Sequence, residues 1–218
     1  MKKIVFLVLT MIFVVSFTCP AQQLSIGFKP SFLIVGAKYS EQPTSTDFSI
    51  KARSSYAIGI TISDQINHLF GIKIEPRYIV KGYNFLWSSN EKDVIRNNYF
   101  SLPLLFSVSP IKNINFELGP EICHLFSSKI KWSGTKSFQS YESPDQKPLE
   151  ISLLTGITYS LKNRFDFGTR FGIGFTPYEK GQLIVFDEQH PPVYYKVVQR
   201  YFEFYLNTRI LTKNTKSN

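Results

Sequence analysis

Eight segments of this chain alternate apolar and polar residues with a period of two, and the links between them are alternately short and long. A period of two is typical of strands that have one face in an apolar environment and the other in a polar one. The segments are LSIGFKPSFLIV (24–35), SSYAIGITIS (54–63), FGIKIEPRYIVKGYNF (70–85), NYFSLPLLFSV (98–108), INFELGPEICHLF (114–126), EISLLTGITYSL (150–161), RFDFGTRFGIGFT (164–176) and RYFEFYLNTRIL (200–211).

The link lengths predict how these strands are arranged. Short links follow the second, fourth and sixth strands, at 64–68, 109–113 and 161–164, whereas long polar links cover 36–53, 83–97, 127–149 and 177–199. Short turns at one end and long loops at the other are typical of a transmembrane β-barrel with periplasmic turns and extracellular loops. An even strand number closes such a sheet without a free edge. The sequence therefore predicts an all-β fold, an eight-stranded antiparallel up-and-down transmembrane β-barrel.

Periodicity alone leaves a second fold open, because a secreted soluble barrel that binds a small apolar ligand has the same alternation with its faces inverted. Two observations favour the membrane. The apolar faces are nearly free of charge. Aromatic residues also gather near both strand ends, as in the interfacial belts of membrane barrels. Phe70 and Phe106 belong to the belt near the short turns, and Tyr56, Tyr78 and Phe126 to the belt near the long loops.

The polar face contains bases and acids in nearly equal number. An eight-stranded barrel encloses a space that side chains just fill, and an unpaired buried charge costs several kcal/mol. We therefore expect a structural network of ion pairs in the lumen and no open pore. The expected network consists of Lys29, Lys73, Glu75, Arg77, Lys81, Glu117, Glu121, Asp166, Arg170, Glu203 and Arg209.

The ends of the chain differ in composition from the strands. Two lysines, an apolar run and the polar segment before Ala21 form the layout of a secretory signal peptide, which we expect at 1–21. The barrel is expected at 22–212 and a frayed tail at 213–218. The predicted mature chain keeps one cysteine, Cys123, which is expected to be a small buried hydrophobe and to form no intramolecular disulfide. The net charge is positive, but no basic block is present, so no nucleic-acid partner is predicted.

Three segments carry a family resemblance: IEPRYIVKGYNF, NNYFSLPLLFSV and NINFELGPEICHLF. They resemble the PorT-like outer-membrane β-barrel family of Bacteroidota-type bacteria, with its E-x-x-Y-x-x-K-G, Y-x-x-x-P-L-L and x-G-P strands. The matching residues are Glu75, Tyr78, Lys81, Gly82, Tyr99, Pro103, Leu104, Leu105, Gly119 and Pro120. The resemblance implies an eight-stranded outer-membrane barrel, and one branch of the family is associated with a secretion and maturation system. Pro76 departs from the family pattern, and we expect a bulge or a barrel-rim position there.

No constellation in the sequence meets the requirements of a catalytic or metal site. An outer-membrane hydrolase would need a histidine with an acid or serine at the outer rim, and His124, Ser127, Ser128 and the run 187–190 are the residues available. Such a rim hydrolase is kept as an alternative. The dispersed histidines and Cys123 do not have metal-ligand spacing. We predict no catalytic, cofactor-binding or metal residues and no cofactor.

These features predict a non-enzymatic protein of the bacterial outer membrane with a structural or interaction role in the envelope, in which a place within a secretion or assembly system is one option. The expected partners are outer-membrane lipid and other envelope proteins contacted through the loops or turns, and a monomer is favoured over an obligate oligomer. Aromatic residues in the long links either bind a partner or extend the strands as hairpins above the membrane, and extension is favoured. Gly172 and Gly174 are expected to leave room for a bulky lumen neighbour.

Overall fold

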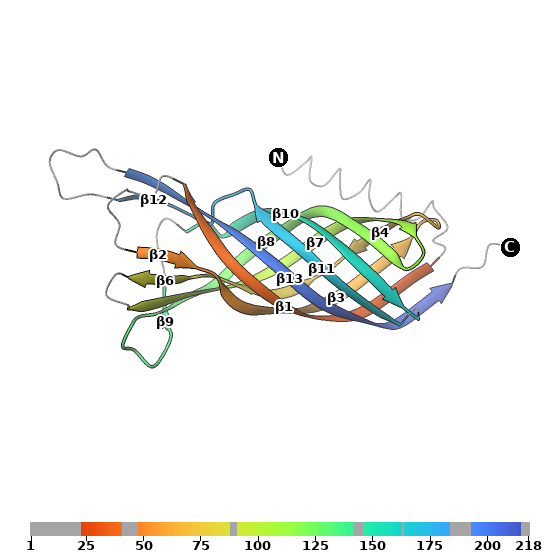
Figure 1. Ribbon diagram of the computed structural model, residues 1–218, viewed down its shortest axis with the longest axis horizontal. Coiled ribbons are helices and arrows are strands. Elements are labelled where there is room, and N and C mark those ends of the chain that lie inside the picture. Colours follow the sequence, from red (N-terminus) through yellow and green to blue (C-terminus); the bar gives the residue numbers. More distant parts are fainter. Residues whose placement is uncertain are drawn as a thin grey trace.

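The chain forms a closed antiparallel barrel (Figure 1). The computed structural model describes residues 23–40, 48–87, 91–141, 146–162, 164–183 and 193–214. Among these residues, no helix is long and apolar enough to cross a membrane. The strands are β1 (Gln23–Ser40), β2 (Phe48–Lys51), β3 (Arg53–Gln65), β4 (Phe70–Ile74), β5 (Arg77–Lys81), β6 (Asn84–Trp87), β7 (Lys92–Ile111), β8 (Ile114–Lys131), β9 (Gln139–Ser140), β10 (Leu149–Leu161), β11 (Phe165–Gly174), β12 (Glu179–Leu183) and β13 (Val193–Asn214).

The pairing of the strands closes a ring. β1 pairs with β3 and with β13, β3 pairs with β4 and β5, and both of these pair with β7. The ring continues through β8, β10 and β11 back to β13. β4 and β5 are two halves of one wall strand, so the ring has eight members, and the predicted fold class is confirmed.

Pro76 separates β4 from β5 without shifting the register. Ile74 lies opposite Ile62, and Arg77 lies opposite Gly59, so both strands advance by the same number of residues across the gap. Proline has no N–H to donate to the ladder, which interrupts the hydrogen bonding there. The Pro76 carbonyl still accepts a bond from the Ile60 amide at 3.1 Å. The expected bulge or rim position is therefore wrong, because Pro76 lies in the middle of a wall strand and a missing donor breaks the ladder without requiring an extra residue.

The apolar faces point outwards and the polar faces point into the barrel. Phe32, Ile60 and Phe167 expose 50%, 48% and 46% of their surface, whereas Lys29 and Arg170 expose 3% and 1%. Large exposed apolar surface belongs against hydrocarbon, and buried charges belong in a narrow lumen. The alternative of a soluble barrel with an apolar interior is therefore wrong.

At one end of the barrel the wall strands continue into hairpins that belong to the same sheet. β2 pairs with β6, β6 with β7, β9 with β8, and β12 with β13. Figure 1 shows β2, β6, β9 and β12 together at one end, opposite the C-terminal end of β13. The upper aromatic belt is the one near the long loops, which includes Tyr56, Tyr78 and Phe126. We call the described residues beyond this belt the extension. The prediction that the long links extend the strands is confirmed. The loops are therefore shorter than the predicted links, since β7 alone has 20 residues.

The expected end segments are only partly described. The expected signal peptide, 1–21, lies outside the described residues. β13 runs to Asn214, two residues into the segment expected as a tail, because Lys213 and Asn214 still pair with Leu24 and Gln23 at the start of β1. The short turn before β4 is held by Asn67, whose side-chain oxygen accepts bonds from the Leu69 and Phe70 amides, both at 2.8 Å.

Candidate functional site in the barrel lumen

Every residue of the expected lumen network forms an ion pair inside the barrel, with the side chains almost fully withdrawn from solvent. The most exposed are Lys73 and Arg209, with 13% and 16% of the side chain accessible. Each strand presents alternate residues to the lumen, and the tilt of the strands brings charges from different walls to the same level. The structure therefore joins charges that lie far apart in the sequence.

Glu75 lies at the centre of the network. Lys29 donates to its carboxylate at 2.7 Å, and the Arg170 guanidinium binds both of its oxygens, at 2.5 and 2.8 Å. A bidentate arginine is a strong and directional partner for a buried carboxylate. Glu75 comes directly before Pro76, so the interrupted part of the wall strand holds the central acid of the lumen.

Arg77 links two further walls. One of its terminal nitrogens donates to both oxygens of Glu203 at 2.8 Å, and the other donates to Glu121 at 2.5 Å and to the Tyr201 hydroxyl at 2.7 Å. Lys29 also lies 3.4 Å from Glu203, which connects this group to Glu75. A single arginine thus crosses the lumen between β5, β8 and β13.

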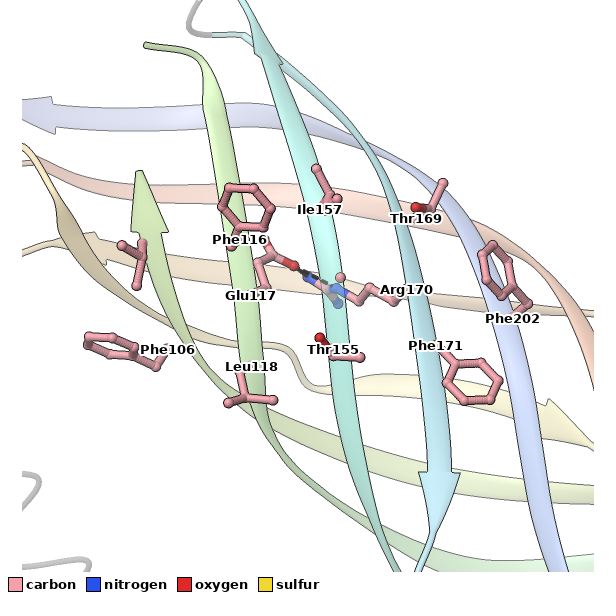
Figure 2. A pocket seen from close by; sticks show the side chains of 12 residues that line it. Phe106, Phe116, Glu117, Leu118, Thr155, Ile157, Thr169, Arg170, Phe171 and Phe202 are labelled. Atoms are coloured by element: carbon pink, nitrogen blue, oxygen red, sulfur yellow. Dashed lines mark hydrogen bonds and ion pairs between the residues drawn. The ribbon is translucent and has the colours of Figure 1, made fainter. Parts of the chain in front are cut away.

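Glu117 and Arg170 meet across a glycine. Gly156 on β10 lies opposite Glu117 on one side and opposite Arg170 on the other. A Cβ at Gly156 would lie 2.5 Å from Arg170 Cγ, so only glycine leaves room for the guanidinium to reach Glu117. Figure 2 shows this ion pair, and the Arg170 Nε donates to Glu117 at 2.7 Å. Lys73 donates to the other carboxylate oxygen at 2.5 Å.

The outer wall over this ion pair is hollowed. The hollow has a volume of about 620 Å³, and its lining includes Phe106, Phe116, Leu118, Phe171 and Phe202. Figure 2 shows these apolar side chains around the Glu117–Arg170 pair. Because they belong to the outward apolar face, the hollow opens towards hydrocarbon. It does not give access to the lumen charges from water.

The upper end of the network contains an acid outside the predicted set, Glu150. Lys81 donates to Glu150 at 2.7 Å, to Glu121 at 3.4 Å and to the Cys123 sulfur at 3.3 Å. Glu150 is fully buried and begins the inward face of β10. The alternation of β10 could have identified it, because Ile151 and Leu153 point outwards. With Glu150, the network balances Lys29, Lys73, Arg77, Lys81, Arg170 and Arg209 against Glu75, Glu117, Glu121, Glu150, Asp166 and Glu203.

The lower end of the network is more polar and less enclosed. Arg209 donates to Asp166 at 2.6 Å, and Asn207 donates to the same carboxylate at 2.8 Å. A polar cavity of about 210 Å³ adjoins this end, with Asp64 and His68 near the short turns among its lining residues. The lumen therefore opens towards the periplasmic side only as far as the ion pairs.

Tyrosines on β7 and β13 complete the lumen and are not among the predicted lumen residues. The Lys29 ammonium lies 3.8 Å from the centre of the Tyr205 ring, which allows a cation–π contact. Tyr201 packs against Gly172, where a Cβ would lie 2.5 Å from the ring, so the expectation of room for a bulky neighbour is confirmed at this glycine. The alternation of β13 could have identified Tyr201 and Tyr205, because both occupy inward positions on this strand.

Apolar side chains pack among the upper charges of the lumen. Leu33, Val35, Ile79, Tyr99 and Leu154 are almost completely buried and pack with Cys123. Above them, Tyr83 and Tyr178 are joined through their hydroxyls at 2.6 Å within a second apolar cluster. The burial of Cys123 agrees with its expected role as a small hydrophobe.

The candidates for rim catalysis do not converge among the described residues. His124 lies on the outward side of β8 and is exposed, whereas the Ser128 hydroxyl donates to Asn97 at 2.6 Å. The run 187–190 lies outside the described residues. Within the described part of the chain, no group of histidine, cysteine and carboxylate side chains has the arrangement of a metal site.

The fold and lumen define a class, the small outer-membrane β-barrels, and comparison with known proteins agrees. The model of the outer membrane protein β-barrel domain matches residues 20–179, and the chain belongs to this family. The protein is therefore located in the bacterial outer membrane, with its short turns periplasmic and its long loops extracellular. No curated protein matches the chain.

Solved barrels are similar in fold. The crystal structure of Neisserial surface protein A has a TM-score of 0.52 and 12% identity, and the match covers 86% of this chain and 99% of that one. The outer membrane protein OprG from Pseudomonas aeruginosa has a TM-score of 0.51 and 12% identity, with coverage of 88% and 97%. At such low identity, these similarities establish the fold alone.

Proposed function

We propose that the protein is a non-enzymatic barrel that does not conduct solutes and that acts at the cell surface through its extension. The observation that carries the proposal is the closed lumen, in which Arg77 alone binds Glu121, Glu203 and Tyr201. Removing hydration from so many charges is tolerated only when they pair with one another. Ions would have to break these pairs and also pass the buried apolar side chains around Leu33 and Tyr99.

The extension supports the interaction role. A strand needs about 9–11 residues to cross the hydrocarbon, whereas β7 has 20 and β13 has 22. Asp93 stiffens the extension, since its carboxylate accepts bonds from the Trp87 indole at 2.7 Å and the Ser133 amide at 2.8 Å. Trp87, Trp132 and Phe138 expose 38%, 44% and 39% of their surface there. Exposed aromatic residues on a rigid support are typical of binding surfaces.

Two finer parts of the proposal rest on other observations. The PorT-like resemblance of the Glu75 to Gly82 and Tyr99 to Leu105 segments supports a place in a secretion or assembly system, and comparison of secreted proteins in a deletion strain tests it. Closure of the sheet at β1 and β13 supports a monomer, because the barrel has no free edge for strand exchange. The mass of the detergent-solubilised protein tests that part.

Conductance in planar lipid bilayers tests the closed lumen. We expect the folded protein, identified by heat-modifiable gel mobility, to produce no steady current steps under conditions in which an open porin does. Steps of porin-like size from the wild-type protein would refute the proposal. A matched pair of variants tests the role of the extension. Trp132→Ser should weaken binding of envelope partners and leave the bilayer without current steps, whereas Phe106→Leu, on the outward apolar face of the wall, should change neither.

A further inference from the structure

The exposed charges of the extension are almost all positive. Among the described residues beyond the upper aromatic belt, the exposed carboxylate is Glu91. An excess of positive charge is usual on a surface that faces an anionic layer. The exposed bases of the extension are Lys38, Lys51, Lys92, Lys129, Lys136, Lys147, Lys196 and Arg200.

Two bases lie directly opposite each other on the outer wall. Arg96 on β7 is the register partner of Lys129 on β8. Like charges at directly opposite positions destabilise a sheet, because their Cβ atoms lie only about 5 Å apart. The described residues provide no ion-pair partner for either side chain. Arg96 donates instead to neutral groups, the Tyr56 hydroxyl at 3.1 Å and the Asn98 side-chain oxygen at 3.3 Å.

A third cation adds to this local excess. Arg53 is partly buried and donates to the Ile95 carbonyl at 2.8 Å. Burial and the nearby charge of Arg96 lower the pKa of the Arg53 guanidinium. Three cationic side chains, from β3, β7 and β8, thus lack a compensating acid among the described residues.

The same two bases lie above an aromatic surface. Tyr78 lies between Tyr56 and Phe126, with ring centres 6.1 and 5.9 Å apart. Tyr56 and Phe126 expose 47% and 58% of their surface. Aromatic rings of this kind lie at the level where acyl chains meet headgroups. The cations therefore stand at headgroup height, directly above a surface suited to an acyl chain.

The arrangement recurs on the opposite side of the ring. Lys38 on β1 and Arg200 on β13 occupy diagonal positions, because Arg200 is the register partner of Gly36. They border an outward-facing pocket of about 260 Å³ whose apolar lining includes Ile34, Phe171 and Phe202. A second, independent pair of bases above apolar residues makes a chance pairing at Arg96 a poor explanation.

We propose that Arg96 and Lys129 form a binding site for the phosphate group of a phosphorylated lipid in the outer leaflet, with its acyl chain against Tyr56, Tyr78 and Phe126. A phosphate between the two bases accepts charge-assisted hydrogen bonds from both and removes their repulsion. The aromatic surface favours a lipid over a soluble anion, since a free phosphate gains nothing from apolar contact. The site is independent of whether the lumen conducts.

Native mass spectrometry of the full chain in detergent, titrated with bisphosphorylated lipid A, measures the site. The test variant is Arg96→Gln with Lys129→Gln. The matched control is Lys92→Gln with Lys136→Gln, which removes the same charge from exposed positions of the extension. Lys129→Gln alone is included because an exposed side chain can be exchanged without effect on folding. Gel mobility confirms that each variant is folded.

We expect the test variant to bind lipid A about 30-fold more weakly, because each base near an anionic surface contributes about 1 kcal/mol and 1.4 kcal/mol is tenfold. Lys129→Gln alone should lose about fivefold. The control should bind like the wild type, and dephosphorylated lipid A should bind weakly to all variants. Equal affinity of test variant and control would overturn the proposal. Displacement of lipid A by inorganic phosphate alone would also overturn it, since the site would then recognise a soluble anion.

Discussion

Replacing Arg77 by methionine tests whether the lumen is as dry as its ion pairs imply. Arg77→Met keeps most of the side-chain volume and removes the bonds to Glu203, Glu121 and Tyr201, of 2.8, 2.5 and 2.7 Å. Among the described residues, Glu203 then keeps Lys29, at 3.4 Å, and Ser31 as partners. Breaking a buried ion pair by removing one partner costs about 3–5 kcal/mol. We expect a loss of that size in the free energy of unfolding.

A second substitution separates lost charge balance from lost packing. In Arg77→Met with Glu203→Gln, the remaining lumen bases and acids are again equal in number, and the glutamine can still accept from Ser31. Replacing a buried ion pair as a whole is often nearly neutral. The double variant should therefore recover about half or more of the stability that the single variant loses. Lys136→Met serves as the control, because Lys136 is exposed in the extension.

Urea titration in phospholipid vesicles, followed by tryptophan fluorescence and by gel mobility, measures the unfolding free energies. Trp87 and Trp132 lie in the extension, so gel mobility is needed to report on the barrel wall itself. A loss below about 1 kcal/mol for Arg77→Met is the value of a solvated surface pair and would refute the dry lumen. A double variant no more stable than the single one would refute the role of charge balance.

Two further pairs of substitutions test the outer face and the wall contacts. Ile74→Arg should impair insertion by about 2–4 kcal/mol, because Ile74 faces hydrocarbon midway along its wall strand, while the adjacent Lys73→Gln should cost less. Vesicle insertion assays measure both, and equal tolerance would contradict the assignment of the faces. Gly119→Ala should destabilise the barrel by about 1–3 kcal/mol, since the new Cβ would overlap the Leu104 carbonyl oxygen. Gly36→Ala, whose Cβ would have ordinary contact with Ala52 at 3.7 Å, should be tolerated, and a similar loss in both variants would count against this steric reason.

The sequence by itself determined the strands and the division of their residues into two faces. Alternation on β3, from Ser55 to Ile62, and on β8, from Phe116 to His124, is local information, because successive side chains of any strand point to opposite sides. Link lengths gave the strand order and the ends of the barrel. Because side chains also alternate along β10, the inward position of Glu150 could have been predicted from the sequence.

The sequence favoured the polar face as the inner one, but only the tertiary structure settled that choice and decided which charges meet. A period of two is symmetric, so the same pattern serves a soluble or a membrane barrel until the sheet closes. The partners of Arg77 depend on the tilt and stagger of the closed ring, which bring Glu203 opposite it across 126 positions of sequence. Pro76 is the clearest case: the missing donor was readable in the sequence, but the unshifted register around it depends on pairing with β3 and β7 at once.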